Sequence, residues 1–208
     1  LGDIKARGVK VLEHNYPFNY STINNRAASV ATGDVIGLVN NDIEVIESGW
    51  LKEMIAQLQR PNVGAVGAKL LWPNYMVQHG GVVVGINGLA AHVGNDLQQR
   101  DAGYLGLNQL THRRSAVTAA CLLVTKSLYD DVRGLDELAF PVAFNDVDFC
   151  MRIFEQNKHI IWTPFSQLVH AESASRGKDH SPEKLSRARR EQRYFFEKWC
   201  LKGWSDPH

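Results

Sequence analysis

The chain has few cysteines, no excess of charge of either sign and no long apolar run. Its 208 residues include three cysteines, Cys121, Cys150 and Cys200, and none of them forms a CxxC pair. This spacing indicates neither a disulfide framework nor a cysteine zinc site, so we expect a reducing, cytoplasmic setting. The formal net charge is +1. No strong electrostatic field therefore attracts a polyanion, which argues against a nucleic-acid-binding protein.

No apolar segment approaches the roughly 18–20 residues of a membrane-spanning helix, and the N-terminus has no signal-peptide pattern. The segment Gly85-Ile86-Asn87-Gly88 matches neither a phosphate-binding loop nor a dinucleotide fingerprint. The length fits one globular domain with an appendage. Because the chain begins at Leu1, in what reads as the middle of a helix-to-strand connection, we expect it to be part of a longer protein.

Apolar periodicity predicts an α/β domain. The run from Val35 to Val39 is short, β-branched and continuously apolar, which is typical of a strand covered on both faces in a parallel sheet. Ser21 is a candidate N-cap for the helix before it. Residues 72–114, richer in Gly, Asn and Gln, are expected to form short strands and loops. The other predicted elements are strands at 9–13, 63–70, 116–124 and 159–162, and helices at 21–31, 49–58, 127–132 and 146–156.

A compositional break precedes the last part of the chain, which reads as a basic helix. We therefore divide the chain into a domain at 1–181 and a helical tail at 182–208. Two interpretations of the tail stay open: its aromatic side chains pack on the domain, or the helix lies on an anionic membrane surface near a lipid-linked acceptor. Its basic and aromatic residues are Arg187, Arg189, Arg190, Arg193, Lys198, Tyr194, Phe195, Phe196, Trp199 and Trp204.

A first acidic cluster, Asn40-Asn41-Asp42, follows the predicted strand that ends at Val39. In open α/β sheets, ligands bind at the carboxyl ends of the strands. A carboxylate flanked by carboxamides and by Glu44 has the oxygen ligands that Mg²⁺ or Mn²⁺ prefers. The same residues also favour a plain turn, because Asn and Asp bond to their own backbone. The residues alone leave both interpretations open.

A second acidic cluster places Asn145, Asp146 and Asp148 at a predicted helix N-terminus. Carboxylates at this position stabilise the helix dipole, so capping is one interpretation. Two acids so close together also suit a general base with a supporting partner. Arg152 lies four residues after Asp148, at the spacing of a helical ion pair.

Two histidines stand at strand ends. His170 closes Leu168-Val169-His170, and His79 lies in Gln78-His79-Gly80-Gly81. As single residues, both favour the interpretation as structural histidines over that as ligands.

Taken together, the motifs resemble those of the family-two glycosyltransferases, which are inverting enzymes with a GT-A fold. The resemblance covers roughly residues 9–176, and the ordered set is more specific than any one piece. The matching motifs are Asn24-Asn25-Arg26-Ala27, Thr32-Gly33-Asp34, Asn40-Asn41-Asp42, Trp50-Leu51, Gln78-His79-Gly80, Val117 to Cys121, Gly134-Leu135-Asp136-Glu137, Phe144 to Asp148, and Pro164 to His170.

This resemblance implies a mixed, mostly parallel central sheet flanked by helices. Family members begin with a βαβ unit whose second strand ends in an acidic residue that contacts the nucleotide base. That unit is missing from this sequence. A donor site built from this chain alone would therefore be incomplete, and the isolated fragment is expected to bind donor weakly or to need association.

The resemblance also implies roles for single residues. The family's DxD motif falls on Asn40-Asn41-Asp42, so Asp42 would bind a Mn²⁺ or Mg²⁺ ion that bridges the donor diphosphate. Asn40 replaces the first acid and brings no charge. The family's late histidine falls on His170, which would be a second ligand to the metal.

The family's catalytic base falls on Asp146, and Asp148 would orient acceptor hydroxyls or support the base. Asp146 would take a proton from the acceptor hydroxyl in a single displacement that inverts the anomeric carbon. The remaining residues expected to contact donor or acceptor are Asn40, Asn41, Asn145, Thr118 and His79.

We therefore expect an inverting glycosyltransferase that moves sugar from a nucleotide-diphospho-sugar to a saccharide or lipid-linked saccharide acceptor, in surface polysaccharide biosynthesis. The expected location is cytoplasmic, with a peripheral contact at the inner face of the membrane and a homo-oligomer left open. Two other functions compete. One is a pseudoenzyme that binds a saccharide or a partner; the other is a metal-dependent nucleotidyl or phosphoryl transferase, which the absence of a phosphate loop disfavours.

Overall fold

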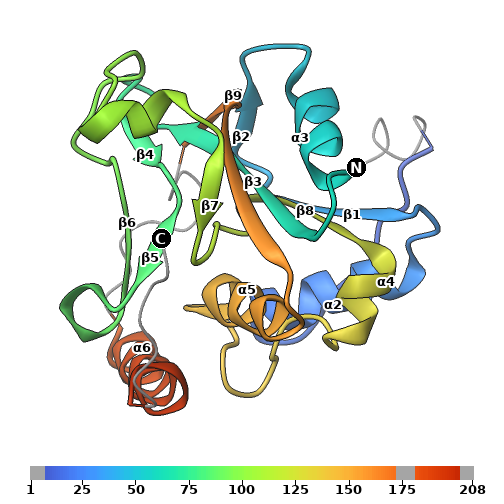
Figure 1. The fold of residues 1–208 in the computed structure, drawn as a ribbon. Coiled ribbons are helices and arrows are strands. Elements are labelled where there is room, and N and C mark those ends of the chain that lie inside the picture. Colours follow the sequence, from blue (N-terminus) through green and yellow to red (C-terminus); the bar gives the residue numbers. More distant parts are fainter. Residues whose placement is uncertain (1–7, 172–180, 202–208) are drawn as a thin grey trace.

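A computed structural model describes residues 8–171 and 181–201 of the chain (Figure 1). A seven-stranded sheet forms its centre, in the order β1-β8-β3-β9-β2, with β4 paired to β3 and β7 paired to β9. Strands β5 and β6 form a second, two-stranded sheet. The strands are β1 (Val35–Val39), β2 (Ile43–Val45), β3 (Val63–Leu71), β4 (Val77–His79), β5 (Val82–Val84), β6 (Ala90–His92), β7 (His112–Arg114), β8 (Cys121–Thr125) and β9 (His159–His170).

Helices cover both faces of the central sheet (Figure 1). They are α2 (Tyr20–Val30), α3 (Trp50–Leu58), α4 (Lys126–Asp131), α5 (Asn145–Glu155) and α6 (Pro182–Phe195); the chain also forms the short helices η1 (Ile86–Gly88), η2 (Tyr104–Gln109) and η3 (Phe196–Cys200). None of the helices in the described ranges is long and apolar enough to cross a membrane.

The sheet is mixed, as expected, but the expectation that it is mostly parallel is wrong. Within the described residues, only β3 and β9 run parallel, and the other pairs in the sheet are antiparallel. Strand β1, predicted to lie in a parallel sheet, pairs antiparallel with β8. An apolar run indicates burial but carries no information on strand direction. Among the described strands, β1 lies at the end of the strand order, and it buries only the alternate residues Ile36 and Leu38.

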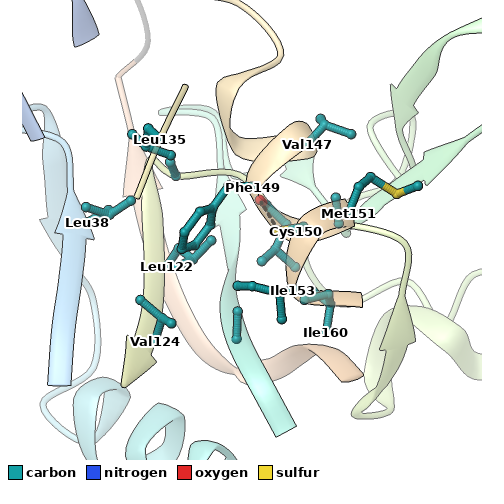
Figure 2. Packing of buried hydrophobic residues seen from close by; sticks show 14 of the residues in the cluster. Leu38, Leu122, Val124, Leu135, Val147, Phe149, Cys150, Met151, Ile153 and Ile160 are labelled. Carbon is teal, nitrogen blue, oxygen red and sulfur yellow. Dashed lines mark hydrogen bonds between the residues drawn. The ribbon is translucent and has the colours of Figure 1, made fainter. Parts of the chain in front are cut away.

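The two faces of the sheet have separate cores. On one face, Met54 and Leu58 of α3 pack against alternate residues of β3, including Val66 and Leu70. On the other face, α2 and α5 contribute to a larger cluster around Phe149, which is fully buried. Figure 2 shows the part of this cluster in which α5 meets β8 and β1. Burial of one side chain of this size stabilises the fold by about 1.5–3 kcal/mol.

Most predicted elements form within a few residues of their expected bounds, with two corrections near the N-terminus. Residues 9–13 form no strand. The N-cap of α2 is Asn19 rather than Ser21, since the Asn19 side chain accepts the Thr22 N–H at 3.0 Å. Ser21 is buried instead, and its hydroxyl donates to the Phe140 carbonyl at 2.6 Å.

The tail helix packs its aromatic side chains on the domain, in agreement with the first of the two interpretations. Phe195 of α6 is fully buried and its ring stacks on that of Phe144, with ring centroids 4.8 Å apart. Trp199 of η3 is also buried. Phe196 and Tyr194 remain exposed. Trp204 lies outside the described residues.

Gly67 of β3 allows the segment that carries Thr118 to pack close against this strand. A Cβ atom on Gly67 would lie 2.4 Å from the Cβ of Val117. Val117 is fully buried directly over the strand. Only a residue without a side chain therefore lets the segment after Val117 lie flat against β3.

We predict that Gly67→Ala lowers the free energy of unfolding by about 1–3 kcal/mol, because the added methyl overpacks the core. Gly49→Ala is the control, since a Cβ there meets no atom within 4 Å and should change stability by less than about 0.5 kcal/mol. Urea unfolding measures both. Equal stability of the two variants would contradict the prediction.

Candidate active site

Strand pairing brings the two ends of the predicted metal site together. Strand β2 pairs antiparallel with the end of β9, with Ile43 opposite His170. The Ala171 N–H donates to the Asp42 carbonyl at 3.1 Å, which extends this pairing by one residue. As a result, the His170 Nε2 atom lies 3.2 Å from the Asp42 Oδ1 atom.

Gln78, at the centre of β4, fixes the orientation of the His170 ring. The His170 Nδ1 atom lies 2.7 Å from the Gln78 Oε1 atom, and the Gln78 amide donates to the His170 carbonyl at 3.3 Å. Because an amide oxygen can only accept, Nδ1 carries the hydrogen of the neutral ring. Nε2 then carries no hydrogen and lies beside Asp42, and a bonded second nitrogen is the usual support of a metal-binding histidine.

The pair formed by Asp42 and His170 fits a divalent cation. Asp42 Oδ1 is buried and accepts no hydrogen bond from the described part of the chain. Two acceptors 3.2 Å apart repel each other unless a proton or a cation lies with them. A carboxylate suits Mg²⁺ or Mn²⁺, and a neutral imidazole nitrogen is a common metal ligand.

The two ligands would not enclose an ion by themselves. Among residues 8–171 and 181–201, no group of three or more His, Cys, Asp or Glu side chains is placed to hold a metal. Mg²⁺ is typically bound by one or two carboxylates together with phosphate oxygens of the substrate. The site therefore fits an ion that arrives with a phosphorylated ligand better than a permanently bound structural ion.

The two asparagines of the first cluster differ in position. The Asn40 side-chain nitrogen lies 3.3 Å from His170 Nε2, so Asn40 is part of the candidate metal site. Asn41 is exposed. The positions of Asn40 and Asn41 do not test their predicted contacts with donor or acceptor.

Asp146, the predicted base, stands in the first turn of α5 and is partly exposed. Its Oδ2 atom accepts the Ala119 N–H at 3.2 Å, and its Oδ1 atom accepts the Val147 N–H at 2.8 Å. Backbone donors on both oxygens fix the carboxylate's orientation without neutralising its charge. The group can therefore present a lone pair in one direction.

The segment from Thr118 to Ala120 joins the two acidic clusters. The Asn40 N–H donates to the Ala120 carbonyl at 2.9 Å, while the neighbouring Ala119 N–H holds Asp146. Thr118, partly exposed, precedes these contacts. One short segment is thus hydrogen-bonded both to the first acidic cluster, at Asn40, and to the candidate base, Asp146.

Asp148 and Asn145 have other surroundings. Asp148 is fully buried, and its carboxylate accepts from Arg152 Nε at 2.8 Å, Lys198 Nζ at 2.6 Å and Trp199 Nε1 at 3.0 Å. Buried Asn145 donates to the Val142 carbonyl at 2.8 Å. Asp148 therefore ties α5 to η3, and this arrangement does not favour the predicted contact with acceptor hydroxyls. The helical ion pair of Asp148 with Arg152 is confirmed.

His79 is fully buried next to the segment that joins the clusters. Its Nε2 atom accepts the Thr118 N–H at 3.3 Å, so its Nδ1 atom carries the hydrogen and donates to His92 Nδ1 at 2.9 Å. Burial lowers the pKa of His79 well below 6.5, and the neighbouring His92 and Arg114 lower it further. His79 is thus a neutral histidine that supports Thr118 from behind.

Cysteine chemistry plays no part in this site. Burial raises the pKa of the Cys121 and Cys150 thiols to about 12, so neither is a nucleophile at neutral pH. Both thiols are free.

The arrangement of helices and strands is similar to that of glycosyltransferases of known structure. GalNAc-T7, solved with UDP, GalNAc and Mn²⁺, superposes with a TM-score of 0.68 at 13% identity, over 87% of this chain and 35% of that chain. Mannosyltransferase PcManGT from Pyrobaculum calidifontis, solved with GDP-Man and Mn²⁺, gives 0.56 at 14% identity, over 80% of this chain and 40% of that chain. The fold is the GT-A fold that the motifs predict.

A model of the family described as Glycosyl transferase family 2 matches residues 3–133, more than half of the chain. The chain belongs to this family. The relative named Uncharacterized protein y4gI, from Sinorhizobium fredii (strain NBRC 101917 / NGR234), is 45% identical over 201 residues, which are 97% of this chain. The O-antigen biosynthesis protein RfbC of Myxococcus xanthus is 41% identical over 173 residues, or 83% of this chain. This chain spans only 22% and 14% of their respective lengths.

Sequence reasoning missed two residues that the structure connects to the site. Gln78 holds the His170 ring, whereas the prediction favoured its neighbour His79. Glu191 is the second: its carboxylate is buried against the loop that leads into α5. Its position in the stripe of Arg187, Glu191 and Phe195, four residues apart on one face of the tail helix, is the signal that could have found it.

The depressed pKa of His79 predicts a loss of stability in acid. The unfolded chain binds a proton below a pKa of about 6.5, and the folded chain does not, so stability is full above that pH and falls as the pH drops toward the depressed native value. His79→Gln keeps an acceptor for Thr118. We expect its unfolding free energy to fall less steeply than that of the wild type below pH 6.5, by up to about 1.4 kcal/mol per pH unit.

Urea unfolding at pH 7.5, 6.5 and 5.5 measures this slope. His14→Gln, on the surface segment before α2, is the control and should retain the wild-type slope. Parallel curves for His79→Gln and the wild type would contradict the assignment of the acid sensitivity to His79.

Proposed function

We propose that this chain is the catalytic portion of an inverting glycosyltransferase that takes sugar from a nucleotide-diphospho-sugar with the help of Mn²⁺ or Mg²⁺. The observation that carries the proposal is the 3.2 Å approach of Asp42 and His170, across one short segment from a partly exposed carboxylate at Asp146. Membership of glycosyl transferase family 2 supports it.

In this proposal, Asp42 and His170 hold the cation, and Asn40 lies beside the ion as a neutral neighbour. A bound cation would stabilise the negative charge that grows on the leaving diphosphate. Both similar solved structures contain Mn²⁺ with a nucleotide or nucleotide-sugar, which supports this choice of cofactor. Gln78 keeps the His170 ring in the tautomer whose Nε2 carries no hydrogen, so that Nε2 would bind the cation in place of the Asn40 amide N–H.

Asp146 acts as general base. Its carboxylate takes the proton of the acceptor hydroxyl as that oxygen forms a bond to the anomeric carbon and the bond to the diphosphate oxygen breaks. One displacement inverts the configuration. The Ala119 and Val147 N–H groups hold the carboxylate in place, and Thr118, Asn41 and the acceptor-facing loops of 72–114 complete the donor and acceptor contacts.

The acceptor is proposed to be a saccharide or lipid-linked saccharide of a surface polysaccharide, since a relative at 41% identity is an O-antigen biosynthesis protein. A cytoplasmic location at the inner face of the membrane fits such an acceptor. The exposed basic side chains of α6 then provide a peripheral membrane contact. The division into a domain at 1–181 and a tail at 182–208 remains a prediction, as does a homo-oligomer.

Asp146→Asn tests the proposal in the full-length protein. The carboxamide keeps the size of the side chain and removes the base, so we expect turnover of the nucleotide-sugar to fall by about 10²–10⁴-fold. Binding of Mn²⁺ with the nucleoside diphosphate, measured by calorimetry, should stay within about twofold, because the cation ligands are unchanged. NMR of the wild-type product should show an inverted anomeric centre.

Glu155→Gln, an exposed change near the end of the same helix, is the control and should retain full turnover. Wild-type turnover in Asp146→Asn would refute the base assignment. A wild-type protein that binds a saccharide but transfers no sugar from any nucleotide-sugar would favour the pseudoenzyme.

A further inference from the structure

The loop before α5 is held in a conformation that it would not adopt by itself. Phe144, immediately before the first residue of α5, has φ 59° and ψ 5°, in the left-handed region. A bulky residue rarely occupies this region, because its Cβ crowds the backbone. Phe144 lies two residues before Asp146, so the backbone that aims the base is strained and needs support from its surroundings.

Glu191 of α6 supplies that support through hydrogen bonds. Its Oε2 atom accepts the Ala143 N–H at 2.9 Å, and its Oε1 atom accepts the Val142 N–H at 3.3 Å. These are the two residues directly before Phe144. The carboxylate thus accepts hydrogen bonds from two successive backbone N–H groups at this turn.

The Glu191 carboxylate makes these hydrogen bonds in the protein interior. Glu191 is 2% exposed, and its ion pair with Arg187 is long, at 3.6 Å. Burial raises the pKa of Glu191, and the two N–H donors and Arg187 oppose the rise. A buried carboxylate is costly unless its oxygens are occupied. Glutamine could not replace it, because an amide offers one acceptor oxygen and would set its own N–H₂ against the second donor.

Other residues of the tail also contact the chain near Phe144 and Asp146. The Phe195 ring, four residues after Glu191, stacks on Phe144 at an interplanar angle of 21°. Further on, Lys198 and Trp199 both donate to Asp148, two residues beyond the base. The helix therefore contacts the chain on both sides of Asp146, and it contacts the strained residue directly.

We propose that Glu191 is a positioning residue for the transfer reaction: by holding the N–H groups of Val142 and Ala143, it keeps Phe144 left-handed and aims the Asp146 carboxylate. This inference rests on the proposed role of Asp146. Because Glu191 is buried and both its oxygens accept backbone N–H groups, we expect its effect to fall on kcat and not on donor binding. A shift of about 1 Å in a catalytic group is sufficient for a 100-fold loss of rate.

Glu191→Gln in the full-length protein is the test, with Glu197→Gln as the matched control, since Glu197 lies further along the same tail, is exposed and pairs only with the exposed Arg193 among the described residues. We expect kcat to fall about 10- to 100-fold in Glu191→Gln, with KM for the nucleotide-sugar within twofold of the wild type. Glu197→Gln should match the wild type in both. Phe195→Leu, which removes the stacking but keeps Glu191, should give a smaller loss of kcat.

Amide hydrogen exchange of the folded proteins supplies a readout independent of turnover. Residues 142–147 should exchange faster in Glu191→Gln than in Glu197→Gln, while β3 and β8 exchange equally in both. Unchanged kcat, unchanged exchange at 142–147, or an equal loss of donor binding and kcat would each overturn the proposal. A wild-type protein without transferase activity would instead refute the proposed function, and the exchange rates at 142–147 would still decide whether Glu191 holds the loop.

Discussion

The pairing of β2 with the end of β9 is the interaction on which the candidate site depends. Strand β9 runs parallel to β3 along most of its length and then meets β2 in the opposite direction, with His170 facing Ile43. The Asp42 carbonyl accepts the next N–H after this pair, that of Ala171. Asp42 and His170, which are 128 positions apart in the sequence, are thereby held side by side by backbone hydrogen bonds. A shift of the register by one residue would turn His170 to the other face of the sheet.

Neutral polar side chains hold the residues around this pair through hydrogen bonds. Gln78 fixes the His170 ring, and His79, kept neutral by burial, accepts from Thr118. Charged contacts are concentrated at Asp148, which accepts from Arg152 of its own helix and is bound to the tail by Lys198 and Trp199. Glu191 adds a second anchor at the loop before α5. The candidate site thus presents the carboxylates of Asp42 and Asp146, which suits a site that receives an anionic ligand with its cation.

The sequence predicted the fold class and the order of most elements, because periodicity and ordered motifs are local signals. It did not predict the strand directions: the apolar run of β1 reads the same whether its neighbour β8 is parallel or antiparallel. Within the candidate site, Asp42 and His170 stand out because Asp42 lies in the turn that follows a strand and His170 ends one. Asp148 could not be separated from Asp146 in this way, since its partners Lys198 and Trp199 come from a helix about 50 positions later. Gln78 and His79 adjoin each other, and only the strand's pairing decides which of them faces His170.

We propose that Asp42 and His170 bind one divalent cation together with a nucleoside diphosphate. Crystals of the full-length protein grown with Mn²⁺ and UDP, measured at the manganese absorption edge, test this proposal. We expect one anomalous peak within ligand distance of Asp42 Oδ1, His170 Nε2 and the diphosphate oxygens. A bound nucleotide with no manganese between these atoms, or a peak at another place, would contradict it.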